Sequence, residues 1–161
     1  MANLFYLDNA ATTYPKPENV HVAMSKFYRE YGVNPGRSGY DQALAAEEVV
    51  HSCRTKLTRF FNGGDPNRMV FTYNATDSLN QIIQGLLYKG GHAISTKLEH
   101  NSVLRPLWHM EHERGNRVTY VDFDEKGFID PDDIKNAIAD DTKLVIINHG
   151  SNVIGTCQPV K

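Results

Sequence analysis

The stretch HAISTKLEHNSVLRPLWHMEHERGNRVTYV, residues 92–121, decides the fold of this chain. It opens with His92-Ala93-Ile94-Ser95 and closes with Val118-Thr119-Tyr120-Val121, and each of these runs predicts a short strand. Between them, from Val103 to Glu113, apolar residues recur at helical spacing. A strand, a helix and a strand in this order indicate a parallel sheet with helices on its faces.

The same alternation continues on both sides of this stretch. Met69-Val70-Phe71-Thr72 predicts a strand, and Asn80 to Leu87 predicts a helix that is entered through polar residues. Further on, Pro131 to Ala139 predicts a helix and Leu144 to Asn148 a strand. We therefore expect an α/β fold with a mainly parallel sheet flanked by helices.

The residues before this alternation are predicted to be mainly helical. Pro15 and Pro17 keep the residues before them extended, and a helix can begin at Pro17. Apolar residues then recur at helical spacing as far as Tyr31. A loop of turn-forming residues covers 32–39. Tyr40 to Phe61 carries the apolar stripe of a long amphipathic helix.

Composition and charge exclude several classes of partner. The formal net charge is −2 and the basic residues are scattered, so neither nucleic acid nor an anionic membrane is expected. No run reaches the roughly eighteen apolar residues of a membrane helix, and the first residues lack the pattern of a signal peptide. We expect a cytoplasmic protein in which Cys53 and Cys157 are free thiols.

Ligands of parallel α/β sheets bind beyond the carboxyl ends of the strands, so the residues after each strand are the candidates for a site. Thr72 is followed by Tyr73 and then by Asn74-Ala75-Thr76-Asp77-Ser78, which places hydroxyls and free backbone N–H groups at a helix N-terminus, where phosphates bind. Taken alone, the same residues are more often a simple helix cap.

Two further strand ends carry polar groups. After Ser95 comes Thr96-Lys97-Leu98-Glu99-His100-Asn101-Ser102, in which the His100 imidazole could stack on a flat ring or exchange a proton. After Asn148, glycines at 150 and 155 let the backbone approach a ligand, and Asn152 offers an amide. Each signal alone fits an ordinary loop, yet three at one sheet edge indicate a phosphate-bearing aromatic cofactor.

His109 and His112 lie one helical turn apart and suggest a metal site. No carboxylate or cysteine occupies a matching position, so the pattern favours a solvated helix face. No metal is therefore expected.

Five blocks of the sequence, in register, resemble the cysteine desulfurase and selenocysteine lyase branch of the class V aminotransferases, which are enzymes of fold type I that depend on pyridoxal 5'-phosphate (PLP). The most specific block reads Glu-His-Asn-Ser-Val-Leu-Arg-Pro-Leu, from Glu99 to Leu107. The blocks are Tyr6 to Thr13, Asn34 to Ser38, Phe71 to Ser78, Glu99 to Leu107, and Asn148 to Pro159. The resemblance implies a three-layer PLP-binding large domain.

The resemblance also implies roles for individual residues. Ala75 and Thr76 would bind the cofactor phosphate, through backbone N–H groups and the threonine hydroxyl. His100 would stack on the pyridine ring and assist proton transfer, as the catalytic residue of this part of the chain. Asn152 would lie near the phenolic oxygen of the cofactor and the substrate carboxylate, and Asn9 to Thr12 would line the substrate entrance.

By the same resemblance, residues 1–161 are the N-terminal segment and the first part of the large domain. The second half of that domain and the C-terminal small domain would be absent, together with the Schiff-base lysine, the desulfurase cysteine and the arginine that binds the substrate carboxylate. Lys161 does not match the lysine motif, and Cys157 falls in a turn. The strand at Met69 to Thr72 would lack its ladder partners, and the chain alone would be inactive.

The activity implied for the parent protein is removal of sulfur from L-cysteine, which gives L-alanine and an enzyme persulfide for iron-sulfur cluster assembly. The implied partners are an amino-acid substrate, cysteine or selenocysteine, a sulfur-acceptor protein and a second copy of the full-length protein in a homodimer. Two alternatives remain open from the sequence. One is another class V enzyme, such as a selenocysteine lyase, an epimerase or an aminotransferase, and the other is a non-catalytic truncated interaction module.

Overall fold

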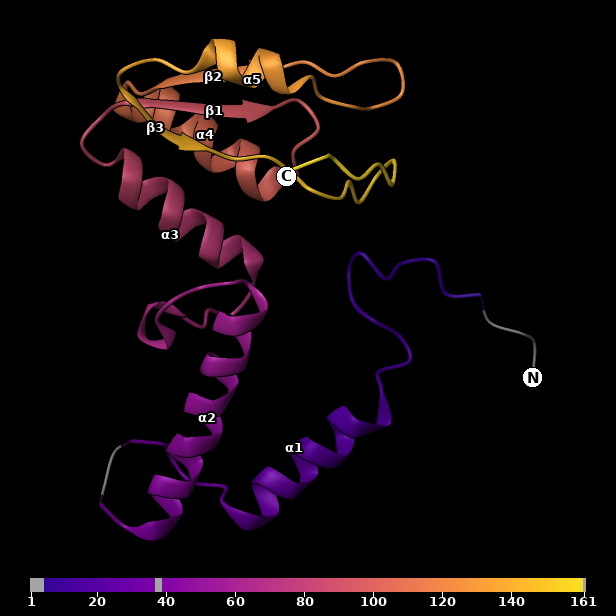
Figure 1. Cartoon of the computed structure of the whole chain (residues 1–161), viewed down its shortest axis with the longest axis vertical. Coiled ribbons are helices and arrows are strands. Elements are labelled where there is room, and N and C mark those ends of the chain that lie inside the picture. Colours follow the sequence, from indigo (N-terminus) through magenta and orange to yellow (C-terminus); the bar gives the residue numbers. More distant parts are fainter. Residues whose placement is uncertain (1–4, 37–38, 161) are drawn as a thin grey trace. The chain divides into compact units, whose positions relative to one another are not determined.

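The computed structural model describes residues 5–36 and 39–160, and the chain divides into two compact units (Figure 1). The first unit ends at Phe71 and the second begins at Thr72, and each is described by itself. Arg37, Ser38 and Lys161, which were named above, lie outside the described residues. Within those ranges, no helix combines the length and the apolar character needed to cross a bilayer.

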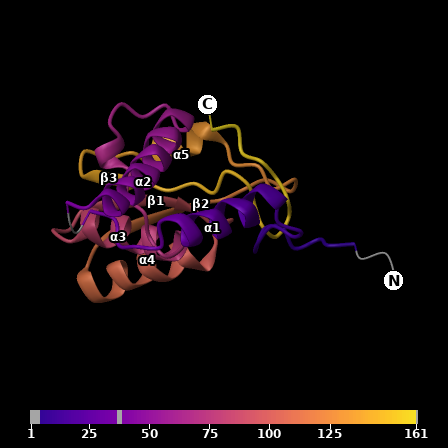
Figure 2. The ribbon, with the colours of Figure 1, turned by 90° about the horizontal axis from the view of Figure 1, so that it is seen from below.

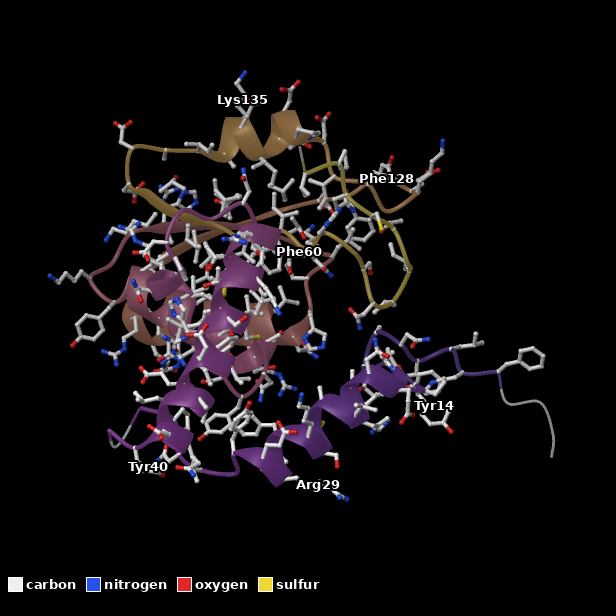
Figure 3. The ribbon with its side chains drawn as sticks, turned by 60° about the horizontal axis from the view of Figure 1, so that its bottom comes forward. Tyr14, Arg29, Tyr40, Phe60, Phe128 and Lys135 are labelled. Carbon is white, nitrogen blue, oxygen red and sulfur yellow. The ribbon has the colours of Figure 1, made fainter. Side chains whose placement is uncertain are left out.

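The first unit holds two α-helices and one short 3-10 helix. α1 spans Glu18–Glu30 and α2 spans Asp41–Phe60, so both predicted helices are confirmed to within one residue at each end. Pro17, with φ −55° and ψ 138°, is the residue before α1, which agrees with an extended entry. Figure 3 shows Tyr40 and Phe60 near the two ends of α2, and η1, Pro66–Arg68, follows it.

Few side chains of these helices are buried. α1 buries no residue, and α2 buries only Ala43, Ala46 and Thr58. Large apolar side chains of the predicted stripe remain exposed, with Leu44 at 53% and Phe60 at 80%. The apolar periodicity therefore predicted the helices correctly, but it does not produce a closed core in this unit.

The strand predicted over Met69–Thr72 is not formed. Among the described residues no strand pairs with this segment, and the Val70 and Phe71 side chains are exposed. A strand exists only through its ladder hydrogen bonds, so an apolar run with strand-like composition but no neighbour stays irregular.

The second unit contains a three-stranded sheet in the order β2-β1-β3, with both pairs of neighbours parallel. β1 is His92–Thr96, β2 is Arg117–Val121 and β3 is Thr142–Val145. The predicted parallel α/β arrangement is thus confirmed. β3 lies earlier than the predicted strand over Leu144 to Asn148, because regular pairing with β1 stops at Val145.

Three helices accompany the sheet, and a side-chain cap begins each of them. α3 spans Ala75–Leu87, α4 spans Asn101–Arg114 and α5 spans Pro131–Ala137. α3 starts five residues before the predicted Asn80, because the Asn74 side chain caps it. The residues read above as a polar entry form its first turn.

The helices lie on opposite faces of the sheet, and Figures 1 and 2 show α4 on one side and α5 on the other. On one face, α3 and α4 bury Ile83, Leu87 and Leu107 against Ala93 of β1. On the other, Ile94 and Val121 pack with Ile134 of α5, whereas Lys135 of α5 extends away from the sheet (Figure 3). Adjacent residues of β1 thus serve different cores, as the alternation of a strand requires.

The sheet also buries a histidine at the N-terminal end of β1. His92 is fully buried, and its ring nitrogens bond the Thr142 hydroxyl of β3 and the Thr119 hydroxyl of β2, each at 2.8 Å. The ring thereby joins all three strands at the edge opposite the candidate site. Burial lowers the pKa of His92, and the charge of Arg117 lowers it further.

Candidate functional site

The N-terminus of α3 combines a helix cap with free donors. The Asn74 side chain accepts the Asp77 N–H at 2.9 Å, and the Asn74 carbonyl accepts the Ser78 N–H at 3.2 Å. The backbone N–H groups of Ala75 and Thr76 have no hydrogen-bond partner among the described residues. The capping alternative is therefore correct for Asn74, and it leaves two donors at the positive end of the helix for an anion.

Thr76 faces a cavity of about 410 Å³ that is formed between α3 and the start of α4. It is lined by Thr76, Asn80, Gln84, His100, Asn101, Ser102, Arg105, Pro106 and His109. The lining contains no carboxylate, whereas it contains a guanidinium, two imidazoles and several amides and hydroxyls. This first cavity therefore suits an anionic group.

His100 is the residue that caps α4. Its Nδ1 accepts the Ser102 N–H at 3.1 Å and lies 2.8 Å from the Ser102 hydroxyl. A neutral ring that accepts a backbone N–H at Nδ1 carries its proton on Nε2. The helix cap thus fixes the ring and leaves Nε2–H as a donor.

A second cavity, of about 450 Å³, lies on the other side of His100. Its lining comes from the end of β1, from Phe123 and from the loop after β3: Lys97, Leu98, Glu99, His100, Asn101, Phe123, Ser151, Asn152, Val153 and Ile154. His100 lines both cavities, and so the structure brings His100 together with Thr76 in one and with Asn152 in the other.

The loop that carries Asn152 is closed on itself. Gly150 and Cys157 form an isolated antiparallel bridge, and the Ser151 hydroxyl accepts the N–H groups of Val153 and Ile154, each at 3.3 Å. Gly155 has φ +73°, a conformation that favours glycine. Asn152 is exposed at the turn, and its side chain makes no hydrogen bond within the described residues.

Residue-level reasoning missed Glu99 as a member of the site. Its Oε1 accepts the Asn148 N–H, from just beyond β3, and the Thr96 hydroxyl at 3.3 Å. Burial raises the pKa of Glu99 above its ordinary value, although these hydrogen bonds oppose the shift. The sequence signal was a carboxyl between a strand and a helix, but its partner lies 49 residues away.

The structure also bears on three other predictions, which concern Ala75, the two histidines of α4 and the two cysteines. Ala75 is exposed beside Thr76 but lines neither cavity, so only its backbone can serve the site. The described residues hold no group of three metal-ligating side chains, and His112 stacks on Trp108 with ring centroids 4.4 Å apart. Cys53 and Cys157 are free cysteines, as predicted.

The residues present fit PLP as far as this part of the chain supplies a site. Two unpaired N–H groups and the Thr76 hydroxyl at a helix N-terminus match a phosphate. The fixed ring of His100 offers a flat face between the two cavities. A phosphate and an aromatic ring are the two recognition elements of this cofactor.

Known proteins resemble this chain in sequence and in fold. The model of the family Aminotransferase class-V matches residues 5–161. The curated protein "Cysteine desulfurase IscS" of Clostridium botulinum is 38% identical over 160 residues, which cover 97% of this chain and 39% of that protein. This chain therefore spans about two fifths of the length of this relative.

Solved structures give the same result. One named "NIFS-LIKE PROTEIN" has a TM-score of 0.86 and 31% identity, and the match covers 96% of this chain and 43% of that one. Another, "SspA in complex with cysteine", also has a TM-score of 0.86 and 31% identity, with 96% and 44% coverage. With a family model matched over nearly its whole length, this chain belongs to the class-V aminotransferase family.

Proposed function

We propose that the chain is the N-terminal part of a PLP-dependent cysteine desulfurase, and that it supplies the phosphate-binding and ring-stacking half of the cofactor site. The observation that carries the proposal is the pair of unpaired N–H groups at Ala75 and Thr76, on the same sheet edge as His100 and Asn152. The similarity to cysteine desulfurases supports this activity over an epimerase, an aminotransferase or an interaction module.

Ala75 and Thr76 hold the phosphate in this proposal. The helix N-terminus carries a partial positive charge, and both N–H groups are free to point at an anion. The Thr76 hydroxyl lines the first cavity and adds a third donor. Hydrogen bonds to a charged group each contribute about 1.5–3 kcal/mol.

His100 orients the cofactor ring and offers a proton at Nε2. Its ring is fixed by the bonds from Ser102 to Nδ1, so the stacking face does not need to be ordered when the ligand binds. The Asn152 amide, in the second cavity, binds polar oxygens of the cofactor or of the substrate carboxylate.

PLP, when bound, supplies an electron sink that lets a bond at the substrate α-carbon break. In this proposal the covalent lysine, the partner of the ring nitrogen and the cysteine that accepts sulfur would belong to the part of the relatives' length that this chain does not cover. The reaction then gives L-alanine and an enzyme persulfide for a sulfur-acceptor protein. We place this chemistry in a cytoplasmic homodimer that serves iron-sulfur cluster assembly.

The phosphate role is tested by Ala75→Pro. Ala75 is the first residue of α3, where proline is tolerated, and Asn74 before it is extended, with φ −167° and ψ 172°. The substitution therefore removes one N–H donor and keeps the helix. We expect PLP affinity, measured by a fluorescence titration, to fall about tenfold or more.

The matched control is Asp41→Pro, which removes the first N–H of α2 after an equally extended Tyr40. It should leave PLP affinity within about twofold of the unchanged chain, because α2 is not part of the proposed site. Equal PLP affinity of Ala75→Pro and the unchanged chain would contradict the role of the Ala75 N–H in binding the phosphate.

Our proposal places the reacting groups outside residues 1–161, and an activity assay tests this assignment. We expect residues 1–161, incubated with PLP and cysteine, to release sulfide no faster than PLP with cysteine alone. The measurement is a colorimetric sulfide assay. Rapid release by the purified chain would contradict the division of the site that we propose.

A further inference from the structure

The carboxyl group of Glu99 joins two loops that belong to different strands. Glu99 follows β1 by three residues, and its Oε1 accepts the backbone N–H of Asn148, three residues beyond the end of β3. The Thr96 hydroxyl donates to the same oxygen at 3.3 Å. One carboxylate oxygen thus binds both strand ends at the sheet edge of the candidate site.

The two joined loops carry the two proposed ligand-binding side chains. His100 is the next residue after Glu99, and Asn152 follows Asn148 by four residues. Regular pairing of β1 with β3 ends at Ile94 and Val145, and the Ile146 N–H still donates to the Ile94 carbonyl at 2.9 Å. Beyond that bond, the Glu99 side chain continues the connection where the ladder stops.

We propose that Glu99 is a positioning residue that holds the Asn152 loop at a set distance from the His100 ring through the Asn148 amide. The expected consequence is that the second cavity has a defined width, and its importance for ligand binding rests on the proposed function. It does not require Glu99 to touch the cofactor or the substrate.

The surroundings of Glu99 support positioning rather than ion pairing. Its side chain is half-buried, and no salt bridge involves it among the described residues. The neighbouring Lys97 is engaged by Asp122 instead. Burial raises the Glu99 pKa, whereas the Asn148 N–H, the Thr96 hydroxyl and the adjacent His100 each lower it. Donors to the carboxylate, rather than a salt bridge, therefore stabilise the charge here.

The acceptor role predicts which substitution is tolerated. In Glu99→Gln the side-chain carbonyl can still accept the Asn148 N–H, while the charge is lost. In Glu99→Ala the acceptor is lost, and the Asn148 N–H opens to solvent. If only the charge of Glu99 mattered, Glu99→Gln would be as harmful as Glu99→Ala.

The experiment measures hydrogen exchange of the Asn148 amide in the 161-residue chain by NMR. We expect Glu99→Ala to speed this exchange at least about tenfold, and Glu99→Gln to stay within about threefold of the unchanged chain. Glu125→Ala, which removes an exposed glutamate from a turn outside both cavities, is the matched control and should change nothing.

Glu99→Gln keeps the proposal testable if Glu99→Ala fails to fold, and Thr96→Val serves as a second control. Thr96→Val removes the hydroxyl that donates to Glu99 and accepts the Leu98 N–H, and it keeps the shape of a fully buried side chain. It should retain the slow exchange of Asn148, because the amide still reaches its acceptor. PLP affinity of Glu99→Ala should fall about tenfold, and that of Glu99→Gln about twofold or less.

The outcomes separate this proposal from the proposed function. Unchanged Asn148 exchange in Glu99→Ala, or equal acceleration in both variants, overturns the positioning role. If the unchanged chain binds no PLP but Asn148 exchange responds as expected, the cofactor assignment fails and the joining of the two loops stands. Equal PLP affinity in all variants, with exchange altered, overturns the link between this contact and the ligand.

Discussion

The two units use the same kind of sequence pattern with different results. Both contain helices with apolar residues at helical spacing, but in the second unit Ile83, Leu87 and Leu107 are fully buried, whereas in the first Leu44 and Phe60 are exposed. The α-helices of the second unit also start at side-chain caps, whereas α1 and α2 of the first unit have none.

The difference shows what a sheet contributes to a helix. An amphipathic stripe specifies a helical segment, yet most of the stability of a helix in a protein comes from packing that stripe against another element. In the second unit β1 provides that surface on both faces. We therefore expect the second unit to be the more stable one, and the site lies within it.

The largest effect should come from the core of the second unit. Leu107→Ala should lower its free energy of unfolding by about 2–5 kcal/mol, because a fully buried side chain leaves a cavity. Leu44→Ala in the first unit should cost about 0.5 kcal/mol or less. In urea unfolding, the fluorescence of the single tryptophan, Trp108 on α4, reports the second unit, and the helical signal in circular dichroism also includes α1 and α2 of the first unit. Similar losses of unfolding free energy in Leu107→Ala and Leu44→Ala would contradict the difference between the two units.

The next effect concerns the packing of the Asn152 loop on the turn before α5. Gly127 has φ +79°, and a Cβ there would clash with the Cδ1 atom of Ile154. Gly127→Ala should cost about 1–2 kcal/mol of backbone strain and a smaller amount for displacing the end of the Ile154 side chain. Gly115→Ala is the control, since Gly115 has φ +70° and open space around it. In thermal unfolding, Gly115→Ala should lose only the stability that is due to backbone strain.

A smaller effect is expected from the helix caps. Asn74→Ala removes the acceptor of the Asp77 N–H and should cost about 1 kcal/mol in urea unfolding. Tyr40→Asn offers a cap to α2, which has none, and should raise the helical signal in circular dichroism. No gain from Tyr40→Asn would mean that the missing cap does not limit the first unit.

The smallest effect should be a pH dependence confined to the second unit. The pKa of folded His92 lies below its ordinary value of 6.5, so the unfolded state binds the proton more tightly. The contribution is fully present above about pH 6.5 and is lost as pH falls from there through the folded pKa. Urea midpoints between pH 8 and 5 measure it, and His92→Gln should flatten that part of the profile.

Much of the second unit follows from the sequence. The apolar runs at His92 and Val118 have strand length and turn signals at both ends, so local pattern suffices to place β1 and β2 within one residue. The polar residues after the strands also indicate the sheet edge that carries His100 and Asn152. The predicted start of α3 was too late because Asn74 to Ser78 were interpreted as a polar entry to the helix, whereas the Asn74 side chain caps the helix and α3 begins at Ala75.

Local pattern alone establishes the helices, two of the strands, the sheet edge of the site and, by resemblance, the family. Tertiary structure decides whether Met69 to Thr72 becomes a strand, since strands need partners that a local pattern does not contain. It also decides that the Glu99 carboxyl accepts the Asn148 amide. That contact joins residues 49 apart, and only the parallel pairing of β1 with β3 brings them together.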